Sequence, residues 1–153
     1  MRNMENLSHL EDHVGYWMRI VSNHISSSFK KKLEEHEVGV AEWVVMRHLY
    51  DQEGLSPSTL AEMTGMTRGA ISKLLDRIFH KKLIERVESS QDRRFQEVKL
   101  SRKGRQLLPK LVALADENDQ QFFGHLSDQQ KQHLIQILKE IVDINHLNQA
   151  PII

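Results

Sequence analysis

Polar and basic side chains recur at helical spacing in one stretch of the chain, and their chemistry suits nucleic acid. If a helix begins after Thr67, its solvent face carries Arg68, Ser72, Lys73 and Arg77. Guanidinium and ammonium groups bind phosphates, and arginine and serine side chains also donate hydrogen bonds to base edges. The stretch therefore predicts a helix with one face for binding nucleic acid.

The apolar residues of the same stretch predict how this helix is held. Thr67 can cap its N-terminus, because a threonine hydroxyl accepts a hydrogen bond from a backbone N–H of the first turn. The helical spacing of apolar residues extends through Leu83, and its first members are Ile71, Leu74, Leu75 and Ile78. These side chains should pack against the rest of the protein and leave the polar face exposed.

A shorter helix is predicted just before it. Ser56 can cap this helix, and Pro57 suits the first helical position, where a backbone N–H would be unpaired anyway. Gly65 can adopt the left-handed conformation that ends a helix in a tight turn. The small side chain of Ala61 lets two helices cross closely, and Ile71 can lock the second onto the first. The two helices therefore predict a helix-turn-helix.

Two strands are predicted after the second helix. Residues Ile84 to Glu88 and Gln96 to Leu100 alternate apolar and polar side chains, and the polar stretch Ser89 to Arg94 connects them. An antiparallel hairpin beside a helix-turn-helix forms a wing, and we use that word for residues 84–100.

The net charge of zero hides an uneven distribution. Residues 67–105 contain 12 Lys or Arg against 5 Asp or Glu, which gives this segment +7 and leaves −7 for the remainder. An ordinary solvated surface is the alternative explanation for such a segment. Because the positive charge coincides with the helix-turn-helix and wing, it favours phosphate binding.

The same stretch resembles the winged helix-turn-helix of the MarR family of bacterial transcription regulators. The matching residues read LAEMTGMTRGAISKLLDRI, then KLIER, then the wing's DRR, and then VKLS followed by Gly104. The chain departs from the family pattern at Lys82, where the family usually has a glycine that ends the second helix. Either Lys82 adopts a strained left-handed conformation or the helix ends differently.

The resemblance implies that the second helix enters the DNA major groove and that the wing places an arginine in the minor groove. The DNA-binding candidates are Thr67, Arg68, Gly69, Ser72, Lys73, Arg77, Arg93 and Arg94. Residues near the start of the second helix should meet base edges, whereas Lys73 and Arg77 should hold phosphates. Asp92, in the Asp-x-Arg motif with Arg94, is expected to orient the wing arginines by an ion pair.

Further helices are expected on both sides of this region. Amphipathic spacing predicts one long helix from Leu7 to about His36, broken by Gly39, and a second over Val40 to Tyr50. Ser101 can cap a long helix, and Ser127 with Gln130 forms a capping box for the last one.

The predicted fold class is mainly α (α+β), with a winged helix-turn-helix DNA-binding lobe and long N- and C-terminal dimerisation helices. The chain would form a single protomer over residues 1–153, with the DNA-binding region at 40–104 and dimerisation helices at 1–38 and 105–153. The long helices have more apolar surface than so small a core can cover. A homodimer would cover it, as the family resemblance also implies; helices that close on their own protomer are the alternative.

Other classes of protein find little support. The chain has no cysteine, phosphate-binding glycine loop or Gly-x-Ser-x-Gly motif, so no enzyme, catalytic residue or cofactor is predicted. It also has no apolar signal core or membrane span, and we expect a cytoplasmic protein. A winged helix that binds protein would present an apolar surface, whereas Arg68 and Lys73 make this one basic.

The histidines leave one alternative open. His9 and His13 are spaced i, i+4, as zinc ligands on one helix face would be, but no further ligands accompany them in a recognisable order. No metal site is predicted, and a zinc-responsive regulator is the alternative function.

The family resemblance also implies a repressor released from its operator, a double-stranded DNA site, by a small aromatic or phenolic effector. The corresponding pocket would use Arg19 for a carboxylate, with Tyr16, Trp43 and Met46 as apolar walls. The alternative is that both tryptophans belong to the core and Arg19 is a surface charge.

Overall fold

Helices make up most of the structure, as the sequence predicts. The computed structural model describes residues 6–88 and 96–147. Its elements are η2 (Leu10–Asp12), α1 (Val14–Glu34), α2 (Val40–Tyr50), α3 (Pro57–Thr64), α4 (Arg68–His80), β1 (Ile84–Glu88), β2 (Gln96–Leu100), α5 (Arg102–Phe123) and α6 (Asp128–Ile144). The predicted fold class is confirmed.

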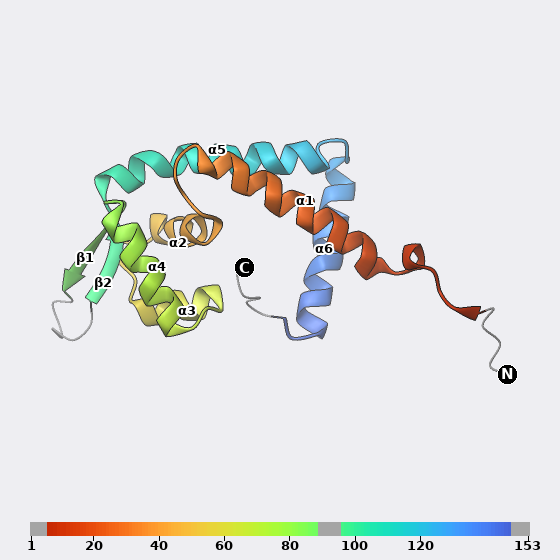
Figure 1. Cartoon of the computed structure of the whole chain (residues 1–153), viewed down its shortest axis with the longest axis horizontal. Coiled ribbons are helices and arrows are strands. Elements are labelled where there is room, and N and C mark those ends of the chain that lie inside the picture. The colour runs from red at the N-terminus through yellow and green to blue at the C-terminus, as the bar shows by residue number, and fades with distance from the viewer. Residues whose placement is uncertain (1–5, 89–95, 148–153) are drawn as a thin grey trace.

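Two long helices form a frame that carries a smaller lobe at one end (Figure 1). Helix α1 packs across α5, while α2 lies between this frame and the lobe made by α3, α4 and the two strands. Helix α6 leaves the opposite end of α5 and faces α1 across a groove. None of the described helices is long and apolar enough to cross a membrane.

The hydrophobic core lies where α2 meets α4 and α5. Its side chains with no more than 1% of their surface exposed include Val45, Met46, Leu49, Ile71, Leu74, Ile78, Leu108 and Leu111. Burying one such side chain stabilises the fold by roughly 1.5–3 kcal/mol. The core therefore fixes α4 against α2 and the frame.

Each predicted helix cap is present. Ser56 Oγ accepts a hydrogen bond from Thr59 N, Thr67 Oγ1 from Ala70 N, Ser101 Oγ from Gly104 N, and Ser127 Oγ from Gln130 N, at distances of 3.0–3.1 Å. The capping box of Ser127 and Gln130 is confirmed. Gly65 ends α3 with φ of 72°, in the left-handed conformation that the sequence predicts.

The prediction of one helix from Leu7 to about His36 is wrong at its start. Helix α1 begins only at Val14, because His13 has extended backbone angles and separates it from the short turn η2. The Asp12 carboxylate accepts a hydrogen bond from His9 N at 2.9 Å and holds this turn. At its other end α1 stops at Glu34, and Glu37, with φ of 57°, turns the chain before Gly39 caps α2.

The second helix of the helix-turn-helix also ends earlier than predicted, at His80 instead of Leu83. Lys82 adopts the left-handed conformation with φ of 62° in place of the family's glycine. Its N–H donates to Phe79 O at 2.9 Å, and Leu83 N donates to Ile78 O at 3.3 Å. This pair of bonds is the Schellman motif, which satisfies carbonyls at the end of a helix.

The strands pair as an antiparallel hairpin with the predicted bounds. Ile84 lies opposite Leu100, and Glu88 lies opposite Gln96. On its other edge β2 exchanges backbone hydrogen bonds with Leu55, whose N–H donates to Val98 O at 2.9 Å. Because Leu55 immediately precedes the cap of α3, this bridge ties the base of the wing to the helix-turn-helix.

The start of α5 packs directly on the turn that ends α4. Ser101 N donates to Leu83 O at 3.0 Å, and Ser101 Oγ donates to Lys82 O at 2.6 Å. Gly104 lies so close to this turn that a Cβ atom placed on it would be 2.2 Å from Leu83 O. The contact requires a residue without a side chain.

We therefore expect Gly104→Ala to destabilise the protein by about 2 kcal/mol or more, since the new methyl group must displace backbone. Gly15→Ala is the matched control, because Gly15 is also helical and its Cβ would meet nothing within 4 Å. This control should gain about 0.5–1 kcal/mol from helix propensity. Urea unfolding of both variants measures the difference, and equal stabilities would refute the close contact.

Candidate DNA-binding surface

Helix α4 presents the predicted polar face to solvent. The candidate residues Thr67, Arg68, Gly69, Ser72, Lys73 and Arg77 are all exposed. On the opposite face, Ile71 and Ile78 have no exposed surface, and Leu74 and Leu75 are at most 3% exposed. The core thus holds one side of the helix and leaves a basic side available.

The turn between α3 and α4 is held by hydrogen bonds within the helix-turn-helix. The buried Thr64 hydroxyl donates to Leu60 O at 2.7 Å and accepts from Met66 N at 3.3 Å. At the start of α4, Arg68 Nη2 donates to Ser58 Oγ at 3.1 Å. The end of α4 that carries the predicted base contacts is therefore fixed to α3.

A salt bridge joins α4 to the wing. The Arg86 guanidinium, on β1, pairs with the Asp76 carboxylate on α4. The same guanidinium lies 4.6 Å from the ring centroid of Phe79, within the range of a cation–π contact. Arg86 therefore links the first wing strand to α4.

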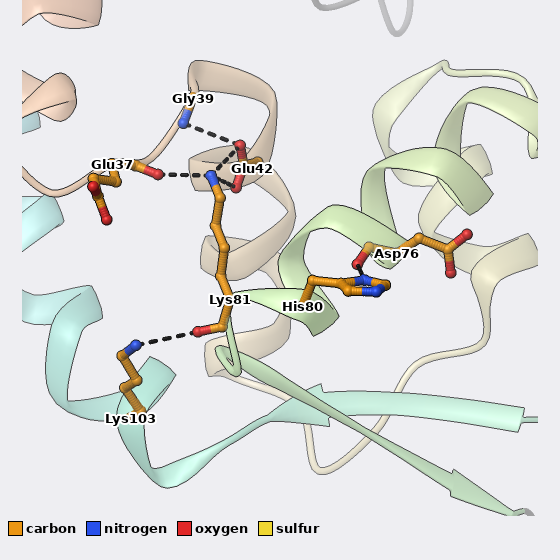
Figure 2. A network of polar contacts seen from close by, with 7 residues as sticks. All are labelled: Glu37, Gly39, Glu42, Asp76, His80, Lys81 and Lys103. Atoms are coloured by element: carbon orange, nitrogen blue, oxygen red, sulfur yellow. Dashed lines mark hydrogen bonds and ion pairs between the residues drawn. The ribbon is translucent and has the colours of Figure 1, made fainter.

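The C-terminal end of α4 is fixed by a buried carboxylate on α2 (Figure 2). Lys81 Nζ donates to both oxygens of Glu42, at 2.9 and 2.8 Å, and to Glu37 O at 2.6 Å. Glu42 is only 5% exposed, and Lys81 supplies its counter-charge. This contact connects α4 with the corner between α1 and α2.

Helix α5 adds a cation at the same end. Lys103 Nζ donates to Lys81 O at 3.2 Å, as Figure 2 shows. A positive charge near the last carbonyls of a helix is favourable, because the helix dipole is negative there. Helices α2 and α5 thus both hold the C-terminus of α4.

The tip of the wing falls outside the described residues, and with it the predicted site residues Asp92, Arg93 and Arg94. The structure describes the strands on either side of that tip. The hairpin, the bridge to Leu55 and the Arg86 salt bridge place the base of the wing beside α4.

The residues predicted to form an effector pocket divide into two pairs. Met46 is fully buried in the core, and Trp43 packs edge to face on Phe29, with ring centroids 5.8 Å apart. Tyr16 and the exposed Arg19 lie in the N-terminal half of α1. Because Arg19 and Phe29 are ten residues apart on one helix, about 15 Å separates the two pairs along its axis.

The predicted helix face shared by His9 and His13 is absent, because the two residues flank the turn η2. The ring nitrogens of His13 lie 2.9 Å from His9 O and 3.3 Å from Ser8 Oγ. Within residues 6–88 and 96–147, no group of three or more His, Asp or Glu side chains could hold a metal ion.

Comparison with known proteins agrees with this architecture. The sequence pattern described as the MarR family matches residues 36–94, which span α2 to the wing. Over these residues the chain is similar to the MarR family. Two relatives that the chain resembles, HosA and SarZ, are named as transcription regulators.

Relatives extend the likeness to the MarR fold beyond this segment. The transcriptional regulator HosA of Escherichia coli O157:H7 is 24% identical over 67% of this chain and 76% of its own length. The structure of S. aureus MepR bound to DNA has a TM-score of 0.78 and 25% identity, covering 86% of this chain and 97% of MepR. Bordetella bronchiseptica BpsR gives a TM-score of 0.79 with 23% identity, over 90% of this chain and 99% of that one.

The sequence did not identify the residues that hold the lobe of α3, α4 and the two strands in place. The charge pattern of residues 67–105 includes Asp76, Lys81 and Arg86 but gives them no partners. No pattern used above points to Glu42. A signal for Glu42 was present, because it occupies the inner face of α2 with Val45, Met46 and Leu49. A lone carboxylate on an apolar helix face predicts a buried partner of opposite charge.

We expect Lys81→Met to destabilise the protein by about 3 kcal/mol. Removing one member of a buried pair costs roughly 3–5 kcal/mol, and the 37% exposure of the Lys81 side chain lowers that figure. Adding Glu42→Gln should recover part of the loss, because the buried charge is then gone. Denaturant unfolding of the single and double variants measures both effects.

Arg47→Ala is the control for this prediction. Arg47 pairs with Asp51 at 2.8 Å on the surface, where the two side chains are 45% and 65% exposed. Its loss should cost about 0.5 kcal/mol or less. If Lys81→Met were no more destabilising than Arg47→Ala, the Glu42 contact would not hold α4.

Proposed function

We propose that this protein is a homodimeric repressor of the MarR family that binds a pseudo-palindromic operator and is released by a small aromatic or phenolic effector. The observation that carries the proposal is the exposed basic face of α4, whose other face is locked into the core. A rigid helix with exposed guanidinium, ammonium and hydroxyl groups can read the major groove.

The position of each side chain on α4 suggests its role. Thr67, Arg68, Gly69 and Ser72 lie in the first turns, which meet base edges when such a helix enters the groove. Gly69 has open space around its Cα, which leaves room for DNA to approach closely. Lys73 and Arg77 lie further along and would bind phosphates. The likeness to MepR, which was solved with DNA, supports this orientation.

A dimer would cover the apolar surface of the frame. Large apolar side chains on the N-terminal part of α1 and on α6 are exposed, among them Val14 at 74%, Trp17 at 51%, Ile135 at 52% and Ile144 at 76%. Some of these side chains, Val14 and Trp17, line an apolar groove with Leu134 and Leu138 of α6, and large exposed apolar surface of this kind usually marks an interaction site. A second copy related by a two-fold axis would pair two α4 helices with two half-sites of DNA.

An aromatic acid is the class of effector that we favour. The DNA binding of Bordetella bronchiseptica BpsR is regulated by 6-hydroxynicotinic acid. In this chain, Tyr16 and Arg19 on α1 offer a ring and a guanidinium three residues apart on one helix side. The effector would act through its different affinities for the DNA-binding and the released arrangement of the dimer.

Base and backbone contacts should respond differently to mutation. Arg68→Ala should lower affinity by about 1–3 kcal/mol and relax preference at particular bases. Arg94→Ala in the wing should weaken binding to many sequences and reduce preference for a narrow, A·T-rich minor groove. Competition binding with variant operators distinguishes the two patterns.

Lys110→Ala serves as the control, because Lys110 is exposed on α5 outside the proposed surface. Its operator affinity should equal that of the wild type. If Arg68→Ala binds the operator with wild-type affinity, α4 is not part of the DNA-binding site. If Arg94→Ala binds with wild-type affinity, the wing is not part of it.

The effector proposal predicts that salicylate lowers operator affinity and quenches tryptophan fluorescence. Arg19→Ala should abolish both effects and leave ligand-free operator binding unchanged, since Arg19 lies outside the DNA-binding lobe. Fluorescence titration and operator competition measure the two effects. Release by salicylate that persists undiminished in Arg19→Ala would exclude this residue from the effector site.

A further inference from the structure

One side-chain hydrogen bond joins the two helices of the helix-turn-helix on their solvent side. Arg68, the first residue of α4, donates from Nη2 to Ser58 Oγ at 3.1 Å. Ser58 is half-buried near the start of α3, whereas Arg68 is exposed. The bond crosses the turn between the helices, so it fixes the Arg68 guanidinium relative to α3 as well as to its own helix.

The first turn of α3 holds Ser58 in a fixed position. Ser56 Oγ accepts a hydrogen bond from Thr59 N at 3.1 Å and lies 2.9 Å from Thr59 Oγ1. Just before this cap, Leu55 N donates to Val98 O at 2.9 Å, and Val98 N donates to Leu55 O at 2.8 Å. Because the cap and the wing both hold this turn, the Ser58 hydroxyl is a rigidly placed acceptor for Arg68.

The acceptor on Ser58 is neutral, so it leaves the charge of Arg68 uncompensated. None of the salt bridges between described residues includes Arg68, whereas the Arg86 guanidinium is paired with the Asp76 carboxylate. A guanidinium has five N–H donors, and Ser58 accepts from one of them, which leaves donors on both terminal nitrogens. Two such donors side by side fit O6 and N7 of guanine in the major groove.

We propose that Ser58 is a positioning residue that holds Arg68 ready to bind one guanine in each operator half-site. This role rests on the DNA-binding function proposed above, in which the first turns of α4 meet base edges. A long side chain loses rotamer freedom when it binds, and one that is already held loses less. Ser58 therefore raises the affinity for operators that carry guanine at that position, and it acts through Arg68.

The guanine is identified with 7-deazaguanine, which lacks the N7 acceptor and otherwise keeps the shape of the base. Each guanine of an operator selected from random DNA is replaced in turn, and the affinity of the full-length protein is measured by competition. At one position in each half-site, the replacement should weaken wild-type binding about ten-fold and leave binding by Arg68→Ala unchanged. If no guanine behaves in this way, Arg68 does not bind guanine and the proposal is wrong.

A double-mutant cycle tests the role of Ser58. Ser58→Ala should weaken binding of the selected operator about three- to ten-fold, because the hydrogen bond to Arg68 is lost. In the Arg68→Ala background the same change should have no further effect, and Ser58→Thr, which keeps the hydroxyl, should bind as the wild type does. Ser27→Ala is the matched control, because Ser27 is an exposed helical serine on α1.

The salt dependence of binding separates positioning from a phosphate contact or a general structural role. Ser58→Ala should keep the wild-type salt dependence, because it removes no charge. An equal loss of affinity in the wild-type and Arg68→Ala backgrounds would overturn the role of Ser58, since the serine would then act without Arg68. If Arg68→Ala weakens operator binding and Ser58→Ala does not, this inference alone is wrong. If Arg68→Ala has no effect, the proposed function of α4 is wrong as well.

Discussion

One buried carboxylate holds the C-terminal end of α4 against the rest of the protein. Glu42 sits on the inner face of α2 among apolar side chains, and it is accommodated there because Lys81 reaches it from the end of α4. The same ammonium group also binds Glu37 O, in the turn that follows α1. One cation thus joins the corner of the frame to the helix that presents the DNA-binding face.

The left-handed residue Lys82 belongs to the same junction. A glycine would adopt this backbone more easily, since a left-handed conformation costs other residues roughly 1–2 kcal/mol. Here the cost is offset by the contacts around it, because Ser101 Oγ binds Lys82 O and Lys103 Nζ binds Lys81 O. The close approach of Gly104 to Leu83 completes the packing of α5 on this turn. The end of α4 is therefore determined by its neighbours more than by its own sequence.

Local signals in the sequence predicted most of the fold. Each helix cap accepts a hydrogen bond from a backbone N–H three residues further along the chain, so local spacing is enough to place the starts of these helices. The caps are Ser56, Thr67, Ser101 and Ser127. Gly65 at the end of α3 and the alternating apolar and polar side chains of β1 and β2 are local signals of the same kind. The bonds of Lys81 to Glu42 and of Arg86 to Asp76 join residues 39 and 10 positions apart, and no local pattern specifies them. The start of α1 was mispredicted because Leu7 and Leu10 continue the helical spacing toward the N-terminus. In the structure Asp12 closes the separate turn η2 on His9, and the extended backbone of His13 separates that turn from α1.

In the proposed function, the α4 helices of two protomers read two half-sites of one operator. Selection of bound sequences from random DNA, followed by hydroxyl-radical footprinting of the selected site, tests it directly. A two-fold dimer should select a pseudo-palindromic sequence with half-sites about one helical turn, roughly 10 base pairs, apart, and should protect the backbone that flanks the major groove at each half-site. Selection without enrichment of any sequence, or a footprint confined to a single unrepeated site, would contradict it.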